Sequence, residues 1–377
     1  MHAVREPGRR VLRRGRVLSA PLRAVIDTAA LQHNLSRVRE FAPGSRVLAV
    51  IKANAYGHGL AAAAGALAGA DAFAVARPEE AVALRESGCR ARIVLLEGFR
   101  DAEELGLTAH HGFEPFIHQD WQVALLESAR AAAPVRAWLK VDTGMHRLGF
   151  APAAVRTAAA RLAACQSVAQ PPALATHLAD AEHEDGEATR AQLAAFFAAT
   201  AGLAGERSIA NSAGLIAWPE ARADWVRPGI MLYGISPFGD RTGAELGLRP
   251  VMTFETAIIA IREVAAGQRV GYGGTWPAPR ASRIAVAAVG YGDGYPRTAA
   301  NGTPVAVAGR MAALAGRPSM DMLTIDVTDV PGAAIGDRVE LWGPAVPIER
   351  VAAAARTIGY ELACRVGRRV RFVTRGP

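Results

Sequence analysis

Residues Val47 to Gly59 read Val-Leu-Ala-Val-Ile-Lys-Ala-Asn-Ala-Tyr-Gly-His-Gly. The apolar run has the length of a buried strand, and the small, polar and glycine residues after Lys52 predict that the strand ends there in a loop. Desolvation at such a strand end lowers the pKa of a lysine toward that of a usable amine nucleophile, the group that forms a Schiff base with an aldehyde. A lysine that simply extends from the strand end to solvent is the alternative.

From Arg23 onward, short apolar runs alternate with longer alanine- and leucine-rich segments, which is typical of repeated βα units around a parallel sheet. About eight strands over roughly 200 residues fit a (β/α)₈ TIM-type barrel, although a doubly wound sheet fits the alternation as well. The candidate strands are 47–51, 72–76, 93–96, 114–117, 137–141, 173–177, 208–210 and 229–233, and helices are expected at 78–87, 120–132, 152–164 and 189–204.

Polar residues favour the barrel, because they follow different strands at or just past their ends. They are Lys52, Lys140, His177 and the pair Asn211 and Ser212. A barrel places its active site at this face and a phosphate site in the loops after strands seven and eight. These loops are here Asn211-Ser-Ala-Gly and Arg227-Pro-Gly-Ile.

The pattern of apolar and turn-forming residues changes past Pro237. Alternating strand-like runs and closely spaced glycine or proline turns predict a β-rich second domain. The sequence is therefore divided into a basic N-terminal extension at 1–22, expected to be disordered, a barrel at 23–245 and a β-rich domain at 246–377.

The segment Ala-Val-Ile-Lys-Ala-Asn-Ala-Tyr-Gly-His-Gly at 49–59 closely resembles the segment with which bacterial alanine racemases of fold type III bind pyridoxal 5′-phosphate (PLP). A motif of this length is highly specific, and the resemblance extends from about Arg23 to the last residues. It implies interconversion of L-alanine and D-alanine, to supply D-alanine for peptidoglycan or to degrade it. It also implies a homodimer with shared active sites, in which Lys52 binds PLP and Tyr56 contacts the phosphate.

The resemblance assigns roles to the segment Lys140-Val-Asp-Thr-Gly-Met-His-Arg147. Arg147 matches a cation near the substrate carboxylate, and Lys140 matches a lysine that is often carbamylated and orients that arginine. Carbamylation makes physical sense, because an unmodified lysine would repel Arg147 whereas a carbamate anion would hold it. Without the resemblance, the same segment is a turn in which Asp142 caps the backbone.

The loops after strands seven and eight suit a phosphate dianion, because a serine hydroxyl, small residues and backbone N–H groups can surround it closely. Arg227 matches the partner of the pyridine nitrogen, which then stays unprotonated because arginine keeps its proton. Ser208 stands where some family members carry a histidine behind that arginine. By resemblance His177 flanks the PLP ring and links Arg227 to the catalytic tyrosine. The residues predicted to contact the cofactor are Lys52, Tyr56, His177, Asn211, Ser212, Arg227, Gly229, Ile230 and Tyr360.

In the β-rich domain, Arg269-Val-Gly-Tyr-Gly-Gly-Thr matches the segment that carries a second catalytic base, Tyr272, which acts in the neighbouring subunit. By resemblance Lys52 serves the D-alanine face of the substrate and Tyr272 serves the L-alanine face. On the residues alone, Tyr272 is an ordinary hairpin tyrosine. Tyr291 matches a residue on the access path, and Met320 and Asp321 match a partner segment whose backbone meets the substrate carboxylate.

The composition indicates a folded, two-domain protein of 377 residues with 51% hydrophobic content. Much of the net charge of +8 comes from six arginines within the first sixteen residues. That arm could bind nucleic acid or a membrane or act as a targeting segment, but a disordered tail is the favoured interpretation. We expect no nucleic-acid or membrane partner and a cytoplasmic protein. Three scattered cysteines argue against a disulfide framework or a structural zinc site.

Other functions fit parts of the same sequence. A racemase of broader amino-acid specificity would differ only in its pocket, whereas a barrel-type PLP decarboxylase would usually place a carboxylate at the ring nitrogen. A non-catalytic PLP carrier would not need the β-rich domain or Tyr272. Gly290-Tyr-Gly-Asp-Gly superficially resembles a dinucleotide fingerprint, but the following Tyr-Pro-Arg prevents the required helix. No metal is expected, because the acids around His183 lack a recognisable ligand spacing.

Overall fold

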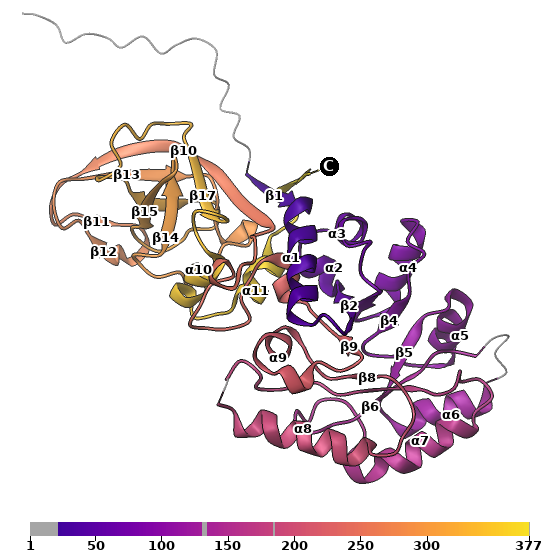
Figure 1. Cartoon of the computed structure of the whole chain (residues 1–377). Helices are drawn as coiled ribbons and strands as arrows, with labels where there is room; N and C mark the ends of the chain where they lie inside the picture. The colour runs from indigo at the N-terminus through magenta and orange to yellow at the C-terminus, as the bar shows by residue number, and fades with distance from the viewer. Residues whose placement is uncertain (1–21, 130–133, 184, 377) are drawn as a thin grey trace, which may run out of the picture.

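The computed structural model describes residues 22–129, 134–183 and 185–376 as a barrel joined to a β-rich part (Figure 1). The basic extension therefore lies outside the described residues, apart from Leu22. Within the described residues, no helix is long and apolar enough to cross a membrane.

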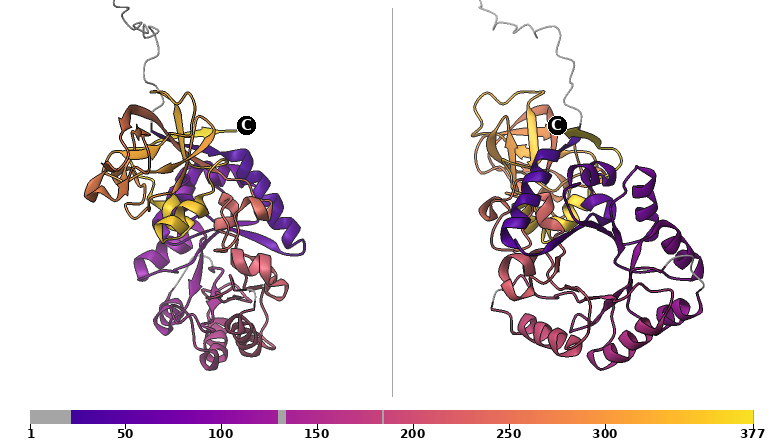
Figure 2. Two further views of the ribbon diagram at one scale, coloured as in Figure 1. Left: turned by 90° about the vertical axis from the view of Figure 1, so that its left-hand side faces the viewer. Right: turned by 45° about the vertical axis from the view of Figure 1, so that its right-hand side comes forward.

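Eight parallel strands close the barrel, which confirms the predicted fold over the doubly wound alternative. The right-hand view of Figure 2 shows the strands as a ring with helices around its outside. The strands are β2 (Arg46–Val50), β3 (Ala72–Val75), β4 (Ile93–Leu95), β5 (Glu114–Ile117), β6 (Trp138–Lys140), β7 (Ala173–Ala175), β8 (Arg207–Ser208) and β9 (Trp225–Val226). The helices are α1 (Thr28–Phe41), α2 (Lys52–Tyr56), α3 (Leu60–Ala66), α4 (Pro78–Glu86), α5 (Ala102–His111), α6 (Asp120–Ser128), α7 (Val155–Ala164), α8 (Glu187–Thr200) and α9 (Ser212–Ala217).

The N-terminal end of the barrel is filled by two tryptophans whose indole nitrogens find buried or half-buried acceptors. Trp138 donates to Glu114 at 2.9 Å, and Trp225 donates to Glu206 at 2.7 Å. Their ring centroids lie 5.8 Å apart. Large aromatic rings with satisfied polar ends thus pack inside this end of the barrel, and the cavity described below lies at the opposite, C-terminal face.

The expected strand at 229–233 is wrong. The eighth strand is β9, and Ile230–Tyr233 instead form a buried 3₁₀ helix, η3. Pro228 has no N–H to continue a strand ladder, and Gly234 ends η3 with a left-handed φ of 77°. This early end of the strand leaves the backbone of Gly229 and Ile230 at the cavity instead of inside the sheet.

The β-rich part contains an eight-stranded sheet in the order β13-β16-β15-β14-β17-β10-β1-β18. Its strands are β1 (Arg23–Asp27), β10 (Met252–Val264), β13 (Ser282–Ala287), β14 (Pro304–Val307), β15 (Arg310–Leu314), β16 (Leu323–Asp326), β17 (Arg338–Trp342) and β18 (Arg371–Arg375), and β11 (Arg269–Val270) pairs with β12 (Trp276–Pro277). Two helices, α10 (Ile348–Ala355) and α11 (Gly359–Arg365), complete it. One element departs from the expected division: β1 lies within 23–245, the range expected for the barrel, but it pairs with β10 and β18 of this sheet.

Helix α11 lies against the loop that follows Lys52, and a glycine permits this contact. A Cβ added to Gly57 would lie 2.2 Å from the carbonyl oxygen of Ala363. Gly57 also has a left-handed φ of 80°, which favours glycine. The close approach brings Tyr360 of the β-rich part to the mouth of the barrel.

Candidate active site

A cavity of about 740 Å³ opens at the C-terminal ends of the barrel strands. The polar residues predicted at the strand ends therefore line one cavity. The predicted residues that line it are Lys52, Tyr56, Lys140, Arg147, His177, Asn211, Ser212, Arg227, Gly229, Ile230 and Tyr360.

Lys52 follows β2 and begins an unusual turn. The next four residues, Ala53 to Tyr56, all have φ between 52° and 55°, which is the left-handed region that side-chain-bearing residues rarely adopt. Burial lowers the pKa of Lys52, and the nearby Arg147 lowers it further, while Glu97 and Glu80 oppose the shift. The pKa thus shifts in the direction that favours an amine able to act as nucleophile and base.

Arg227 is 4% exposed and binds only neutral acceptors. It donates to Ser208 Oγ at 2.6 Å, to the carbonyl of Thr176 at 2.5 Å and to that of Ile209 at 3.1 Å. Burial lowers the pKa of Arg227 to about 10, which leaves it protonated at neutral pH. Because no carboxylate of the described residues forms an ion pair with it, the cation suits an acceptor bound in the cavity.

His177 accepts a hydrogen bond from Arg227 at Nδ1, over 3.3 Å. Burial lowers its pKa well below 6.5, and the charge of Arg227 adds to this effect. The imidazole is therefore neutral, with its proton on Nε2.

The far end of the cavity is built for an anion. Ser212 Oγ accepts the N–H of Gly229 at 2.9 Å, which leaves its own proton available to a ligand. Asn211 caps α9 by accepting the N–H of Gly214 at 2.9 Å. Burial raises the pKa of Tyr56 and of Tyr360, so both hydroxyls stay protonated and can donate.

Lys140 is 7% exposed and its Nζ lies 5.9 Å from the centre of the Phe116 ring. Burial lowers its pKa to about 8, with contributions from Arg227 and Arg147. The following turn has the capping geometry considered for Asp142, whose Oδ1 accepts the N–H groups of Gly144 and His146 at 3.1 and 3.0 Å.

Four predicted residues are not among the described residues that line this cavity. Tyr272 is 66% exposed on the β-rich part, and Tyr291 and Met320 are also exposed. The N–H of Gly292 donates to the carbonyl of Met320 at 2.9 Å, which joins the two loops. Asp321 forms an ion pair with Arg369 at 2.9 Å.

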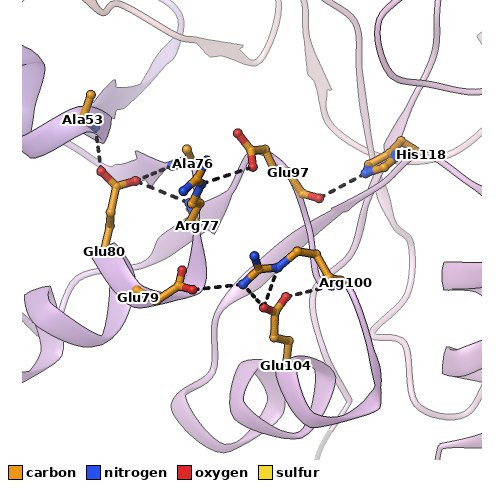
Figure 3. Close-up of polar contacts among 9 residues, drawn as sticks. All are labelled: Ala53, Ala76, Arg77, Glu79, Glu80, Glu97, Arg100, Glu104 and His118. Carbon is orange, nitrogen blue, oxygen red and sulfur yellow. Dashed lines mark hydrogen bonds and ion pairs between the residues drawn. The ribbon is translucent and has the colours of Figure 1, made fainter.

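The sequence prediction missed polar residues on the side of the cavity formed by β3 to β5 (Figure 3). Glu97, two residues past β4, and His118, directly after β5, line it, and the same strand-end rule would have found them. Glu80 lies in the first turn of α4, and its Oε1 accepts the N–H of Ala53 at 2.6 Å. No sequence pattern distinguishes that role from an ordinary acid at a helix start.

Asp180, Glu182 and His183 bring one ligand atom each within 4.8 Å of one another. They lie in the loop before α8, and Glu182 and His183 are exposed. Nothing beyond their proximity points to an ion.

Comparison with known proteins gives one consistent result. A family model described as "Alanine racemase, N-terminal domain" matches residues 26–237, and "Alanine racemase, C-terminal domain" matches residues 251–374. The alanine racemase of Nitrosococcus oceani is 52% identical over 348 residues, covering 92% of this chain and 97% of that protein. That of Vibrio cholerae is 50% identical over 349 residues, covering 93% and 97%.

Solved structures agree. The biosynthetic alanine racemase of Pseudomonas aeruginosa superposes with a TM-score of 0.91 at 46% identity, covering 94% of this chain and 99% of that one. The alanine racemase of Bartonella henselae, described with covalently bound pyridoxal phosphate, gives a TM-score of 0.84 at 32% identity and covers 94% and 100%.

Proposed function

This chain belongs to the alanine racemase family, and on that premise we propose that it interconverts L- and D-alanine with Lys52 and Tyr272 as the two bases. It is an amino-acid racemase that depends on PLP. The observation that supports the residue roles best is that Lys52 and Arg227 line the same cavity at the C-terminal end of the barrel.

The residues present fit PLP. Besides Lys140, four basic side chains line the cavity, Lys52, Arg100, Arg147 and Arg227, and a phosphorylated cofactor and an amino-acid carboxylate are both anions. Ser212, Tyr56 and Tyr360, with the backbone at Gly229 and Ile230, would hold the phosphate. Arg227 would face the pyridine nitrogen, and Asn211 would support the phosphate end by capping α9.

Bound PLP supplies an electron-accepting ring that makes the Cα proton of the amino acid removable at neutral pH. Arg227 limits this effect, because a protonated guanidinium can donate to the ring nitrogen but cannot give it a proton. His177, neutral and hydrogen-bonded to Arg227, would help to keep that guanidinium oriented toward the bound ring.

Racemisation requires a proton to leave one face of Cα and another to arrive on the opposite face, so two bases are needed. Lys52 Nζ would remove the Cα proton of D-alanine in one direction of the reaction and deliver a proton to the same face in the other direction. Tyr272 would do so on the L-alanine face. Arg147 would hold the substrate carboxylate, and Lys140, converted to a carbamate, would hold Arg147 by a charge-assisted hydrogen bond.

The exposure of Tyr272 supports a homodimer with shared sites. A base that is 66% exposed in its own chain and absent from that chain's cavity lining can serve the reaction if it reaches a second copy. Tyr291, Met320 and Asp321 lie on the same β-rich part and would join the partner's site. A two-fold dimer would then build two equivalent sites.

The test is racemisation of L-alanine, L-serine and L-lysine by purified protein with PLP, followed by circular dichroism and chiral chromatography. We expect turnover of alanine far above the other two. Comparable rates for serine or lysine would instead support the broad-specificity racemase, which the comparisons do not favour. The biosynthetic role and the cytoplasmic location stay predictions.

A further inference from the structure

The turn after Lys52 needs an external support. Four successive residues with side chains, Ala53 to Tyr56, are held in the left-handed region, where Cβ crowds the backbone and the conformation is intrinsically unfavourable. Such a conformation persists only where surrounding contacts impose it. The turn comes directly after Lys52, the lysine predicted to bind the cofactor. Relaxation of the turn to a more favourable conformation would therefore move Lys52.

The first N–H of this turn is held by one carboxylate. Glu80 Oε1 accepts the N–H of Ala53 at 2.6 Å, and its Oε2 accepts the N–H of Ala76 at 2.9 Å and of Arg77 at 3.4 Å. Figure 3 shows Glu80 between the turn and the end of β3, with one oxygen directed to each. A single side chain thus fastens the backbone beside Lys52 to the neighbouring barrel strand.

We propose that Glu80 is a positioning residue for Lys52, and that its two carboxylate oxygens fix the left-handed turn so that Nζ returns to one place in every turnover. This inference rests on the proposed function. It concerns a residue in the first turn of α4 that does not line the cavity, and it acts through the backbone of Ala53.

Only a carboxylate of this length meets the requirement. Every hydrogen-bond partner of Glu80 is a donor, so both of its oxygens must accept. The amide of glutamine would turn an NH₂ group toward one set of N–H groups. Aspartate keeps two oxygens but is one methylene shorter, so it cannot reach both Ala53 and the end of β3 from the same position.

The neighbouring Glu79 offers a matched control. It lies in the same turn of α4, but its carboxylate accepts from the exposed side chain of Arg100 at 2.9 Å and not from the turn after Lys52. Asp101 provides a second control, because it caps α5 by accepting the N–H of Glu104 at 2.9 Å. Loss of that cap weakens a neighbouring helix without touching the turn.

The experiment compares Glu80→Gln, Glu80→Asp, Glu79→Gln and Asp101→Ala as purified holoenzymes. We expect both Glu80 variants to lose on the order of tenfold to a hundredfold in kcat, with KM for alanine changed less than about threefold, because misplacement of a catalytic group affects the chemical step. Hydrogen–deuterium exchange of the peptide covering 52–60 should accelerate in both. Both controls should keep wild-type kcat and wild-type exchange in that peptide.

Either Glu80 variant with wild-type kcat and unchanged exchange at 52–60 would overturn the proposal. So would an equal loss of kcat in Asp101→Ala, since that would indicate general loss of stability. If one Glu80 variant does not fold, the other decides. Failure of the proposed function gives a different result, because wild-type protein would then not racemise alanine at all while the exchange comparison would still report on the turn.

Discussion

Ser208 Oγ accepts a hydrogen bond from Arg227 at 2.6 Å while donating its own proton to the carbonyl of Trp225 at 3.1 Å. The serine can therefore only accept from Arg227, and it places no charge beside the guanidinium. Every acceptor of Arg227 is neutral. Hydrogen bonds to neutral groups thus hold the guanidinium in place, and none of these acceptors offsets its positive charge toward the cavity.

Replacing Arg227 with Glu should change the chemistry. A carboxylic acid can share its proton with the pyridine nitrogen and strengthen the ring as an electron acceptor. Racemisation should slow by at least about tenfold, while transamination to pyruvate becomes relatively more frequent. The ratio of pyruvate to racemised alanine measures this. An unchanged ratio in a variant with a normal melting temperature would exclude contact with the ring nitrogen.

Borohydride reduction of the holoenzyme should attach a pyridoxyl group to Lys52. Lys52 is the predicted nucleophile because burial lowers its pKa at the end of β2. Peptide mapping by mass spectrometry locates the label, and Lys52→Ala should abolish both label and racemisation. A label on Lys140 in the wild-type protein would contradict the assignment.

Mixing two inactive variants should restore activity if the sites are shared. Lys52→Ala and Tyr272→Phe homodimers should each be severely impaired. A heterodimer has one site with both lesions and one with neither, so random reassembly should recover about a quarter of wild-type activity. Verified heterodimers that show no gain would place Lys52 and Tyr272 in the same chain's site.

Lys140 should form a carbamate with the carbon dioxide that a bicarbonate buffer supplies. Because its pKa lies at about 8, far more of its amine is neutral near pH 7 to 8 than in an ordinary lysine, and only the neutral amine adds carbon dioxide. Enzyme in ¹³C-bicarbonate should show a carbamate carbon signal that Lys140→Met lacks. Absence of this signal in active wild-type enzyme would rule out the modification.

The same lysine predicts a pH dependence of stability in carbon dioxide-free buffer. Below pH 8 the Lys140 amine is protonated in both the folded and the unfolded state, so burial of its charge fully destabilises the folded state. Between about 8 and the ordinary value of 10.5 the unfolded state binds more protons, so stability rises with pH. The melting temperature of the wild type, relative to that of Lys140→Met, should therefore rise as the pH increases across this range. A constant difference would contradict the shift.

The sequence predicted the barrel and half of the residues that line the cavity. Strand ends share one face, so that rule alone could bring together residues far apart, such as Lys52 and His177. Tyr56, Arg147 and Tyr360 were predicted only through the family resemblance.

The sequence prediction misplaced the eighth strand, since an apolar run at 229–233 reads equally as strand or buried helix. It also assigned β1 to the barrel, because pairing with β18 is a contact between distant segments. The role of Glu80 could not be predicted for a similar reason, because Glu80 accepts the backbone N–H of a distant residue in an unusual turn.

The pairing of β1 with β18 determines when one edge of the sheet can form during synthesis. Asp27 and Arg375, at the ends of these two strands, are 348 positions apart yet share an ion pair at 2.9 Å. A ribosome adding about 5 to 20 residues per second delivers β18 roughly 20 to 70 s after β1. Until then β1 has one edge unpaired, and β18 joins the sheet at that edge only after the residues between the two strands have been made.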